Sequence, residues 1–277
     1  MVALADQKIL DIKGVQTPAL GVGTWQMTGD ECSRSVADGL VMGYRHIDTA
    51  QMYENEVDVG RGIAESGVER DEIFLTTKLS LHNVTAEAAR RTTEESLTNL
   101  RTEYVDLLLI HWPSHDVPLE ETLAAMQELR EEGKTRRIGV SNFPPSLLKR
   151  AREQADIFCN QVEYHPFLSQ NRLLRSVRDE GLLLTAYCPL ARGKVMEDET
   201  IGGIARLYER SPAQIALRWL IQQDVAAIPK ASNTDHLAAN LDIFDFELSQ
   251  EEMRRISQLG NEERLINPDW GPAWERM

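Results

Sequence analysis

Short apolar runs and helical patterns alternate along this chain. Eight runs of five to seven mostly apolar residues are each followed by a polar turn and then by a stretch with helical periodicity. The runs are ALGVG (19–23), YRHID (44–48), IFLTTK (73–78), VDLLLIH (105–111), RRIGVS (136–141), IFCNQVE (157–163), LLLTAY (182–187) and VAAIPK (225–230). Near-continuous apolar strands that alternate with helices are typical of a parallel sheet covered by helices.

Two of the expected helices carry clear start signals. Ser211 and Gln214 have the spacing of a capping box, with Pro212 at the first helical position, and Ser249 with Glu252 forms a second box. In such a box each side chain satisfies a backbone N–H group that the helix itself leaves unpaired. We therefore expect helices to begin at both places.

Eight strand and helix units predict a (β/α)8 TIM barrel that occupies residues 1–277 as a single domain. The segment KILDIKGVQT (8–17) predicts a β-hairpin ahead of the first barrel strand. A doubly wound open sheet is the structural alternative. It is less favoured, because no Gly-x-Gly-x-x-Gly turn follows the first run at 19–23.

Charge and composition exclude several classes of protein. Lysine and arginine number 30 against 44 aspartates and glutamates, which gives a net charge of −14. Nucleic-acid binding requires a basic face, so we expect no such partner. No run approaches the roughly 18 apolar residues of a membrane span, and the first residues lack the features of a signal peptide. Three widely spaced cysteines fit a reduced protein, so a cytoplasmic location is expected.

Polar residues end almost every apolar run. In a TIM barrel these ends meet at one face, which carries the active site. The residues at or just after the ends are Thr24, Trp25, Asp48, Lys78, His111, Ser141, Asn142, Gln161, Glu163, Tyr187 and Lys230. The sequence therefore predicts a polar site at the carboxyl ends of the strands.

Asp48, Tyr53, Lys78 and His111 together predict carbonyl reduction. A lysine ammonium beside the Tyr53 phenol would favour the phenolate and lower its pKa, and Asp48 would hold the ammonium in place. Tyr53 would then be a usable general acid, with His111 as a second donor to the same substrate oxygen. The hydride must come from a cofactor, because no side chain can donate one.

These residues lie within motifs that resemble the aldo-keto reductase family, and most of all its prokaryotic 2,5-diketogluconate reductase type. The motifs cover nearly the whole chain: GYRHIDTAQMYENE, TTKL, LLLIHWP, IGVSNF, NQVEYHP, AYCPLARG and IPKAS. The resemblance implies an NADPH-dependent oxidoreductase that acts on small aldehydes, dicarbonyls or keto-sugars. Tyr53 would be the acid, Asp48 and Lys78 would tune it, and His111 would orient the carbonyl.

The resemblance also implies cofactor contacts. Ser141, Asn142 and Gln161 match residues that hold the nicotinamide carboxamide, and Tyr187 matches the residue that stacks on the ring. Cys188 and Leu190 belong to the CPLARG loop, which would lie over the pyrophosphate. Lys230 and Ser232 would contact the 2′-phosphate, with His236 nearby, and Asn240 would contact the adenine. Thr24 and Asp48 are the remaining positions implied in cofactor binding.

Four positions depart from the family pattern. Cys188 replaces a serine, and His236 stands where an arginine commonly binds the 2′-phosphate. Ala239 replaces an acidic residue, and Glu54 replaces a glycine or another small residue. Because histidine cannot reproduce the bidentate, permanently charged contact of arginine, we expect NADPH to be preferred and NADH to be accepted more weakly.

The substrate side is expected to be aromatic. Trp25 and Trp112 would line the mouth together with Tyr53 and His111, and the C-terminal segment NPDWGPAWERM (267–277) would lie over it. A small carbonyl compound is the expected partner, and the chain is expected to be a monomer.

Two other functions compete with this one. A regulatory protein that binds NADPH without turnover is one of them, although such a binder would not need Tyr53 and His111 together. A metal-dependent barrel hydrolase is the other. The six histidines show neither a His-x-His nor a His-Glu-x-x-His pairing, so we expect no bound metal.

Overall fold

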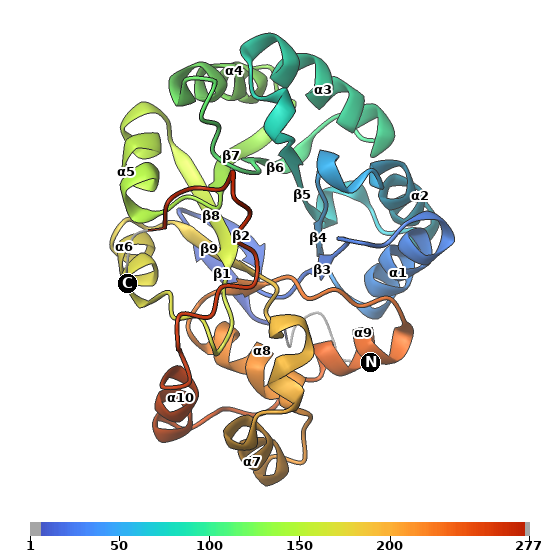
Figure 1. Ribbon diagram of the computed structural model, residues 1–277. Helices are drawn as coiled ribbons and strands as arrows, with labels where there is room; N and C mark the ends of the chain where they lie inside the picture. Colours follow the sequence, from blue (N-terminus) through green and yellow to red (C-terminus); the bar gives the residue numbers. More distant parts are fainter. Residues whose placement is uncertain (1–6, 275–277) are drawn as a thin grey trace.

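Parallel strands closed into a barrel form the centre of the computed structural model, which describes residues 7–274 (Figure 1). The strands are β3 (Val22–Gly23), β4 (His46–Asp48), β5 (Phe74–Leu79), β6 (Val105–Ile110), β7 (Thr135–Ser141), β8 (Ile157–Glu163), β9 (Leu183–Tyr187) and β10 (Ala226–Ala227). They neighbour one another in chain order from β3 to β10. All eight apolar runs of the sequence therefore become the expected strands.

The first and last strands meet and close the sheet. Leu20 bridges Ala227 and Gly23 bridges Lys230 in parallel register, and the amide of Gly21 donates to the carbonyl of Ala227 at 2.9 Å. This closure confirms the predicted (β/α)8 barrel. The doubly wound alternative is wrong, because an open sheet would leave both of these edges unpaired.

Helices surround the barrel on its outside (Figure 1). They are α1 (Gly29–Met42), α2 (Glu56–Ser66), α3 (Ala86–Asn99), α4 (Leu119–Glu131), α5 (Pro145–Gln154), α6 (Asn171–Asp179), α7 (Glu199–Leu207), α8 (Pro212–Gln222), α9 (Thr234–Leu241) and α10 (Gln250–Ser257). Both predicted capping boxes are present, at the starts of α8 and α10. The sequence signals therefore marked these helix starts correctly.

The predicted N-terminal hairpin is present and covers one end of the barrel. Strands β1 (Ile9–Ile12) and β2 (Val15–Pro18) pair in antiparallel register. Lys8 binds Asp224 at 2.5 Å, just before β10, and Lys13 binds Asp156 at 2.8 Å, just before β8. Because both partners precede their strands, the hairpin covers the amino ends of the barrel strands. The carboxyl ends remain available for chemistry.

The C-terminal segment crosses the opposite end of the barrel (Figure 1). Trp270 packs edge-on against Trp112, which follows β6, with 5.1 Å between the ring centroids. The amide of Leu265 donates to the Glu163 carboxylate, at the end of β8, over 2.7 Å. The expected tail over the mouth is thus present as far as Trp274, and residues 275–277 of that segment lie outside the described residues.

Close helix packing beside the site depends on a glycine. Helices α1 and α2 approach each other at Gly62, where an added Cβ would lie 2.8 Å from the Cβ of Val36 and closer still to the carbonyl oxygen of Ser33. Backbone atoms cannot move aside as a flexible side chain can. The packing of α2, which follows the Tyr53 turn, therefore requires a residue without a side chain at position 62.

We predict that Gly62→Ala destabilises the protein by about 1–3 kcal/mol, because overpacking outweighs the better helix propensity of alanine. Urea unfolding followed by circular dichroism measures the change. Gly202→Ala is the matched control, since Gly202 lies within α7 and the nearest atom to its added Cβ is a side-chain nitrogen of Arg206 at 3.8 Å. That variant should gain about 0.5–1 kcal/mol. Equal stability of the two variants would contradict the packing account.

Candidate active site

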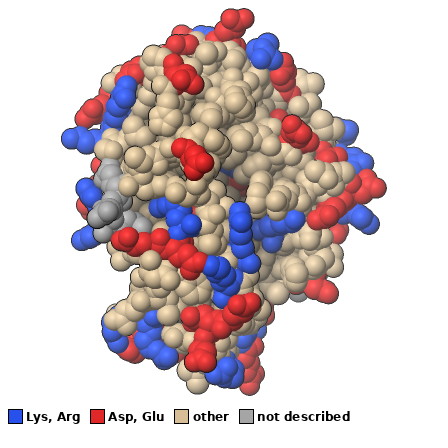
Figure 2. All heavy atoms as spheres, in the orientation of Figure 1, with Lys and Arg blue, Asp and Glu red and all other residues tan. Residues whose placement is uncertain are grey.

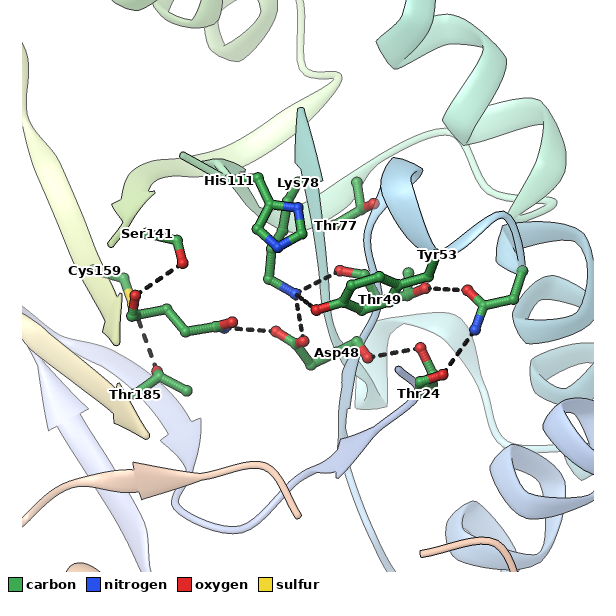
Figure 3. A network of polar contacts seen from close by, with 12 residues as sticks. Thr24, Asp48, Thr49, Tyr53, Thr77, Lys78, His111, Ser141, Cys159 and Thr185 are labelled. Atoms are coloured by element: carbon green, nitrogen blue, oxygen red, sulfur yellow. Dashed lines mark hydrogen bonds and ion pairs between the residues drawn. The ribbon is translucent and has the colours of Figure 1, made fainter. Parts of the chain in front are cut away.

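A buried ion pair lies at the centre of the barrel mouth (Figure 3). Lys78 points inward from β5, and its Nζ atom lies 2.5 Å from Oδ1 of Asp48, at the end of β4. The same Nζ donates to the carbonyl oxygen of Thr49 at 2.8 Å and to the Tyr53 hydroxyl at 3.3 Å. The side chains of Lys78 and Asp48 are 0% and 1% exposed. The ammonium therefore joins the carboxylate to the phenol.

The turn that presents Tyr53 is held by Gln51. Tyr53 ends a short 3-10 helix, η2 (Gln51–Tyr53), directly after β4. The Gln51 side-chain amide donates to the hydroxyl of Thr92 on α3 at 3.1 Å, and its oxygen accepts from the amide of Ser80 at 2.9 Å. Gln51 thus ties the turn to both the next helix and the next strand end. Such contacts fix the position from which Tyr53 reaches the site.

Asn55 fixes the other side of the same turn. Its side-chain oxygen accepts from the Thr49 hydroxyl at 2.8 Å, and its amide nitrogen donates to the carbonyls of Thr24 and Met27 at 2.8 Å each. Neither Gln51 nor Asn55 was singled out from the sequence. The sequence signal for them was weak, because an amide side chain near a strand end usually satisfies only local backbone groups.

Charge interactions act on Tyr53 in opposite directions. Burial raises the pKa of Tyr53, while the charge of Lys78 lowers it and that of Asp48 raises it again. Lys78 thus lowers this pKa as expected, but the net direction is upward. The reason is that desolvation disfavours the phenolate more than one ammonium can compensate. Tyr53 therefore stays protonated at neutral pH, which is the state that can give a proton.

Lys78 remains charged. Burial lowers its pKa, but Asp48 and Tyr53 raise it, and the net direction is upward. An ammonium in this position persists because its carboxylate partner compensates the loss of water. The site therefore contains a permanent positive charge beside the phenol.

His111 follows β6 and completes the set of four. Its ring packs edge-on against the ring of Tyr53, with 5.6 Å between centroids. Burial and then the charge of Lys78 hold the pKa of His111 well below its usual value, so the ring is neutral at physiological pH. Its Nδ1 atom is buried without a hydrogen-bond partner among the described residues. A neutral imidazole with spare hydrogen-bonding capacity therefore faces the phenol.

A second layer of polar side chains supports Asp48 and the strand ends. Gln161, on β8, donates to the second carboxylate oxygen of Asp48 at 2.7 Å, and the Thr24 hydroxyl donates to the Asp48 carbonyl at 3.0 Å. Ser141, on β7, donates to the Gln161 carbonyl at 2.8 Å. These contacts join four of the predicted site residues to one network around the ion pair.

Asn142 and Tyr187 extend this network. The Tyr187 hydroxyl, at the end of β9, donates to the Asn142 side-chain oxygen at 2.7 Å. The Asn142 amide donates in turn to the carbonyl of His111 at 3.0 Å. Asn142 adopts a left-handed backbone with φ 64°. The structure thus brings all the residues predicted near the nicotinamide into one cluster.

The loop after β9 has an unusual backbone. Cys188, Ala191 and Arg192 have φ values of 53°, 48° and 54°, and Gly193 follows with 92°. Left-handed backbone is uncommon for residues other than glycine, and such strain gathers at sites that clamp ligands. Cys188 and the neighbouring Leu190 are half-buried. This is the loop that the sequence assigned to the cofactor pyrophosphate.

Residues predicted near the 2′-phosphate lie on a separate, exposed segment. Lys230, Ser232 and His236 are exposed after β10 and at the start of α9, while Asn240 is buried within that helix. The Lys230 ammonium donates to the carbonyl of Gln26 at 2.9 Å. The structure therefore does not join these residues to the central ion pair. They lie after β10 and in α9, beside the barrel mouth.

The two tryptophans predicted at the mouth differ in how much of their side chains is exposed. Trp25 is 43% exposed, and the guanidinium of Arg192 lies 5.8 Å from its ring centroid. Trp112 is only 5% exposed, because Trp270 covers it. Trp25 is thus partly open to solvent, while Trp112 is almost closed off from it.

Within residues 7–274, no group of three or more His, Cys, Asp or Glu side chains could hold a metal ion. No helix in this range is long and apolar enough to cross a membrane.

Comparison with known proteins places the chain among reductases. Residues 19–261 match the aldo/keto reductase family. The chain is 42% identical to the glyoxal reductase of Bacillus subtilis over 260 residues, which is 92% of this chain and 94% of that protein. It is 39% identical to a methylglyoxal reductase of Escherichia coli O157:H7 over 264 residues, which is 93% of this chain and 99% of that protein.

Solved structures agree with these relatives. A protein provisionally named 2,5-diketo-D-gluconic acid reductase B superimposes with a TM-score of 0.95 at 42% identity, covering 98% of each chain. A Bombyx mori aldo-keto reductase in complex with NADP superimposes with a TM-score of 0.88 at 34% identity, covering 94% of this chain and 95% of that one. Together with the geometry of the barrel mouth, these similarities show that the chain belongs to the aldo/keto reductase family and is an oxidoreductase that acts on carbonyls.

Proposed function

We propose that this enzyme reduces aldehyde and ketone carbonyls to alcohols with NADPH, and that Tyr53 is the general acid. The observation that supports this most directly is the Lys78 ammonium, which contacts both Asp48 and the Tyr53 hydroxyl in a buried site. Small aldehydes, dicarbonyls and keto-sugars are the proposed substrates. The names of the relatives, which include glyoxal and methylglyoxal reductases, favour dicarbonyls among them.

Proton delivery follows from the charges around Tyr53. The phenol is protonated at neutral pH and would give its proton to the oxygen of the carbonyl as negative charge develops there. Lys78 would stabilise the phenolate that remains, and Asp48 would keep the ammonium in place. His111, neutral and beside the phenol, would donate a second hydrogen bond to the same oxygen.

Several features of the structure fit a nicotinamide cofactor, which would supply the hydride when bound. The side-chain oxygen of Gln161 accepts no hydrogen bond from residues 7–274, so it is available to a carboxamide. Tyr187 stands at the end of β9 as the proposed stacking partner, with Ser141 and Asn142 beside it. The strained loop from Cys188 to Gly193 would lie over the pyrophosphate.

The phosphate end of the cofactor needs positive charge from a chain that is acidic overall. Figure 2 shows lysine and arginine side chains gathered along one side of the central hollow of this face. Lys230, Ser232 and His236 are the proposed contacts of the 2′-phosphate, and Asn240 that of the adenine. A monomeric, cytoplasmic enzyme with one domain over residues 1–277 completes the proposal.

We predict that Tyr53→Phe lowers turnover by roughly 10² to 10⁴, because it removes the proton donor. The affinity for NADPH, measured by quenching of protein fluorescence, should stay near that of the wild type. Tyr208→Phe is the control, since the Tyr208 hydroxyl binds Glu252 on the outside of the barrel at 2.7 Å. Steady NADPH oxidation by Tyr53→Phe at the wild-type rate would mean that another group protonates the oxygen.

Lys78→Met should shift the pH profile of alcohol oxidation. In that direction Tyr53 must act as a base, so its phenol has to lose a proton first. Lys78 lowers the pKa of Tyr53, and its removal therefore moves that pKa upward. The rising limb of kcat against pH should move to higher pH while activity falls. Lys134→Met is the control, because Lys134 pairs with Glu94 away from the mouth. An unmoved profile in Lys78→Met would exclude Lys78 from tuning the phenol.

Cofactor choice should depend on the side chain at position 236. It is measured by the ratio of kcat/KM for NADPH to that for NADH. His236→Arg should increase this ratio and leave NADH nearly unaffected, because arginine binds phosphate with a permanent, bidentate charge. A ratio that is unaltered by His236→Arg would place position 236 away from the phosphate.

A further inference from the structure

The C-terminal segment brings an arginine to the barrel mouth. Arg264 stacks on the ring of Trp274, with its Cζ atom 3.6 Å from the ring centroid. The next two amides of the chain, those of Leu265 and Ile266, donate to the carboxylate of Glu163 at 2.7 Å and 2.9 Å. Arg264 is therefore held from two sides, by its own ring contact and by the backbone that follows it.

Among residues 7–274, this guanidinium contacts the Trp274 ring and is paired with no carboxylate. Burial lowers the pKa of Arg264, and the charge of Glu163 opposes this. Its Nη1 atom is buried and without a partner. Partly buried arginines are rarely left in this state, because their five N–H donors lose water without gaining acceptors. The buried Nη1 group is therefore a donor available to an anionic oxygen of a ligand.

Glu163 is close to Arg264 in the structure but is already occupied. Its side chain is 0% exposed, and its oxygens accept from the two tail amides and from His165 Nε2 at 2.9 Å. These bonds hold the pKa of Glu163 below its usual value even though burial opposes this. Glu163 therefore fixes the tail through its backbone and leaves the guanidinium unpaired.

The location of Arg264 connects it with the active site. Burial raises the pKa of Tyr187, at the end of β9 in the central network, and the nearby charge of Arg264 acts against this rise. Six residues further along the tail, Trp270 packs on Trp112, the neighbour of His111. Glu263, just before Arg264, pairs with Lys194 of the loop that follows β9. The tail that carries Arg264 thus contacts the strained loop after β9, the end of β8 and the segment after β6.

We propose that Arg264 forms an oxyanion subsite at the rim of the mouth, which binds a carboxylate carried by the carbonyl substrate. This rests on the proposed reductase function. A planar guanidinium offers two parallel N–H groups to a carboxylate, and its stacking on Trp274 orients the fork in advance. A phosphate of the cofactor has the same chemistry, and the test below separates the two sources.

The test compares two aldehydes that differ only in charge, 4-carboxybenzaldehyde and its methyl ester. Arg264→Gln should raise KM for the acid by about 10- to 100-fold, the size expected for a lost charge-assisted contact, with kcat and the ester little changed. Arg264→Lys, which keeps a point charge, should recover part of the loss. Arg254→Gln removes a surface charge that pairs with Glu251 on α10 and should behave as wild type with both aldehydes.

Binding without turnover provides the second readout. Calorimetric titration of the protein with 4-carboxybenzaldehyde, and fluorescence titration with NADPH, are done for wild type and Arg264→Gln. Weaker binding of the acid alone assigns the subsite to the substrate. Weaker binding of NADPH, with both aldehydes equally affected, assigns it to a cofactor phosphate and overturns the substrate assignment.

Unchanged constants for the acid, the ester and NADPH in a folded Arg264→Gln variant would overturn the subsite altogether. A wild type that fails to reduce even the neutral ester would instead contradict the proposed reductase function, and the two titrations would still decide whether Arg264 binds an anion.

Discussion

The buried ion pair of Lys78 and Asp48 is the constraint on which the active site depends. A lysine that is 0% exposed inside a barrel would lose its charge without a partner, and Asp48 at 2.5 Å supplies one. The pair is costly to bury, so the surrounding structure has to satisfy every remaining polar atom. Gln161 binds the second oxygen of Asp48, and the carbonyl of Thr49 accepts from Lys78. The polar cluster at the mouth is the result of this requirement.

The loops at the mouth are held by contacts between elements that are distant in the chain. Gln51 ties the Tyr53 turn to α3, and Asn55 ties it to the loop after β3. Glu163 in turn binds the backbone of the tail at Leu265. Asn55 and Glu163 are buried and Gln51 is half-buried, and each makes several hydrogen bonds that hold its loop in position. A reacting oxygen would therefore meet donors that are already in place.

Burial also decides how the charged groups behave. In water, an ammonium beside a phenol would lower the pKa of the phenol, whereas here desolvation reverses the net direction for Tyr53. His111 is kept neutral by the same loss of water and by Lys78. Both groups are thus in the protonation states that the proposed donation to a carbonyl would use. The number and kind of charges alone would not have shown this.

The sequence by itself determined the barrel, its hairpin and the four central residues. Eight apolar runs of strand length, most of them ending at a polar residue, are a local pattern that can be read without knowing the tertiary contacts. Tertiary structure decided the rest: the closure at Gly21, the anchors Gln51 and Asn55, and the net direction of the Tyr53 pKa. These features depend on distances between residues far apart in the chain and on the exclusion of water, which a one-dimensional pattern does not contain.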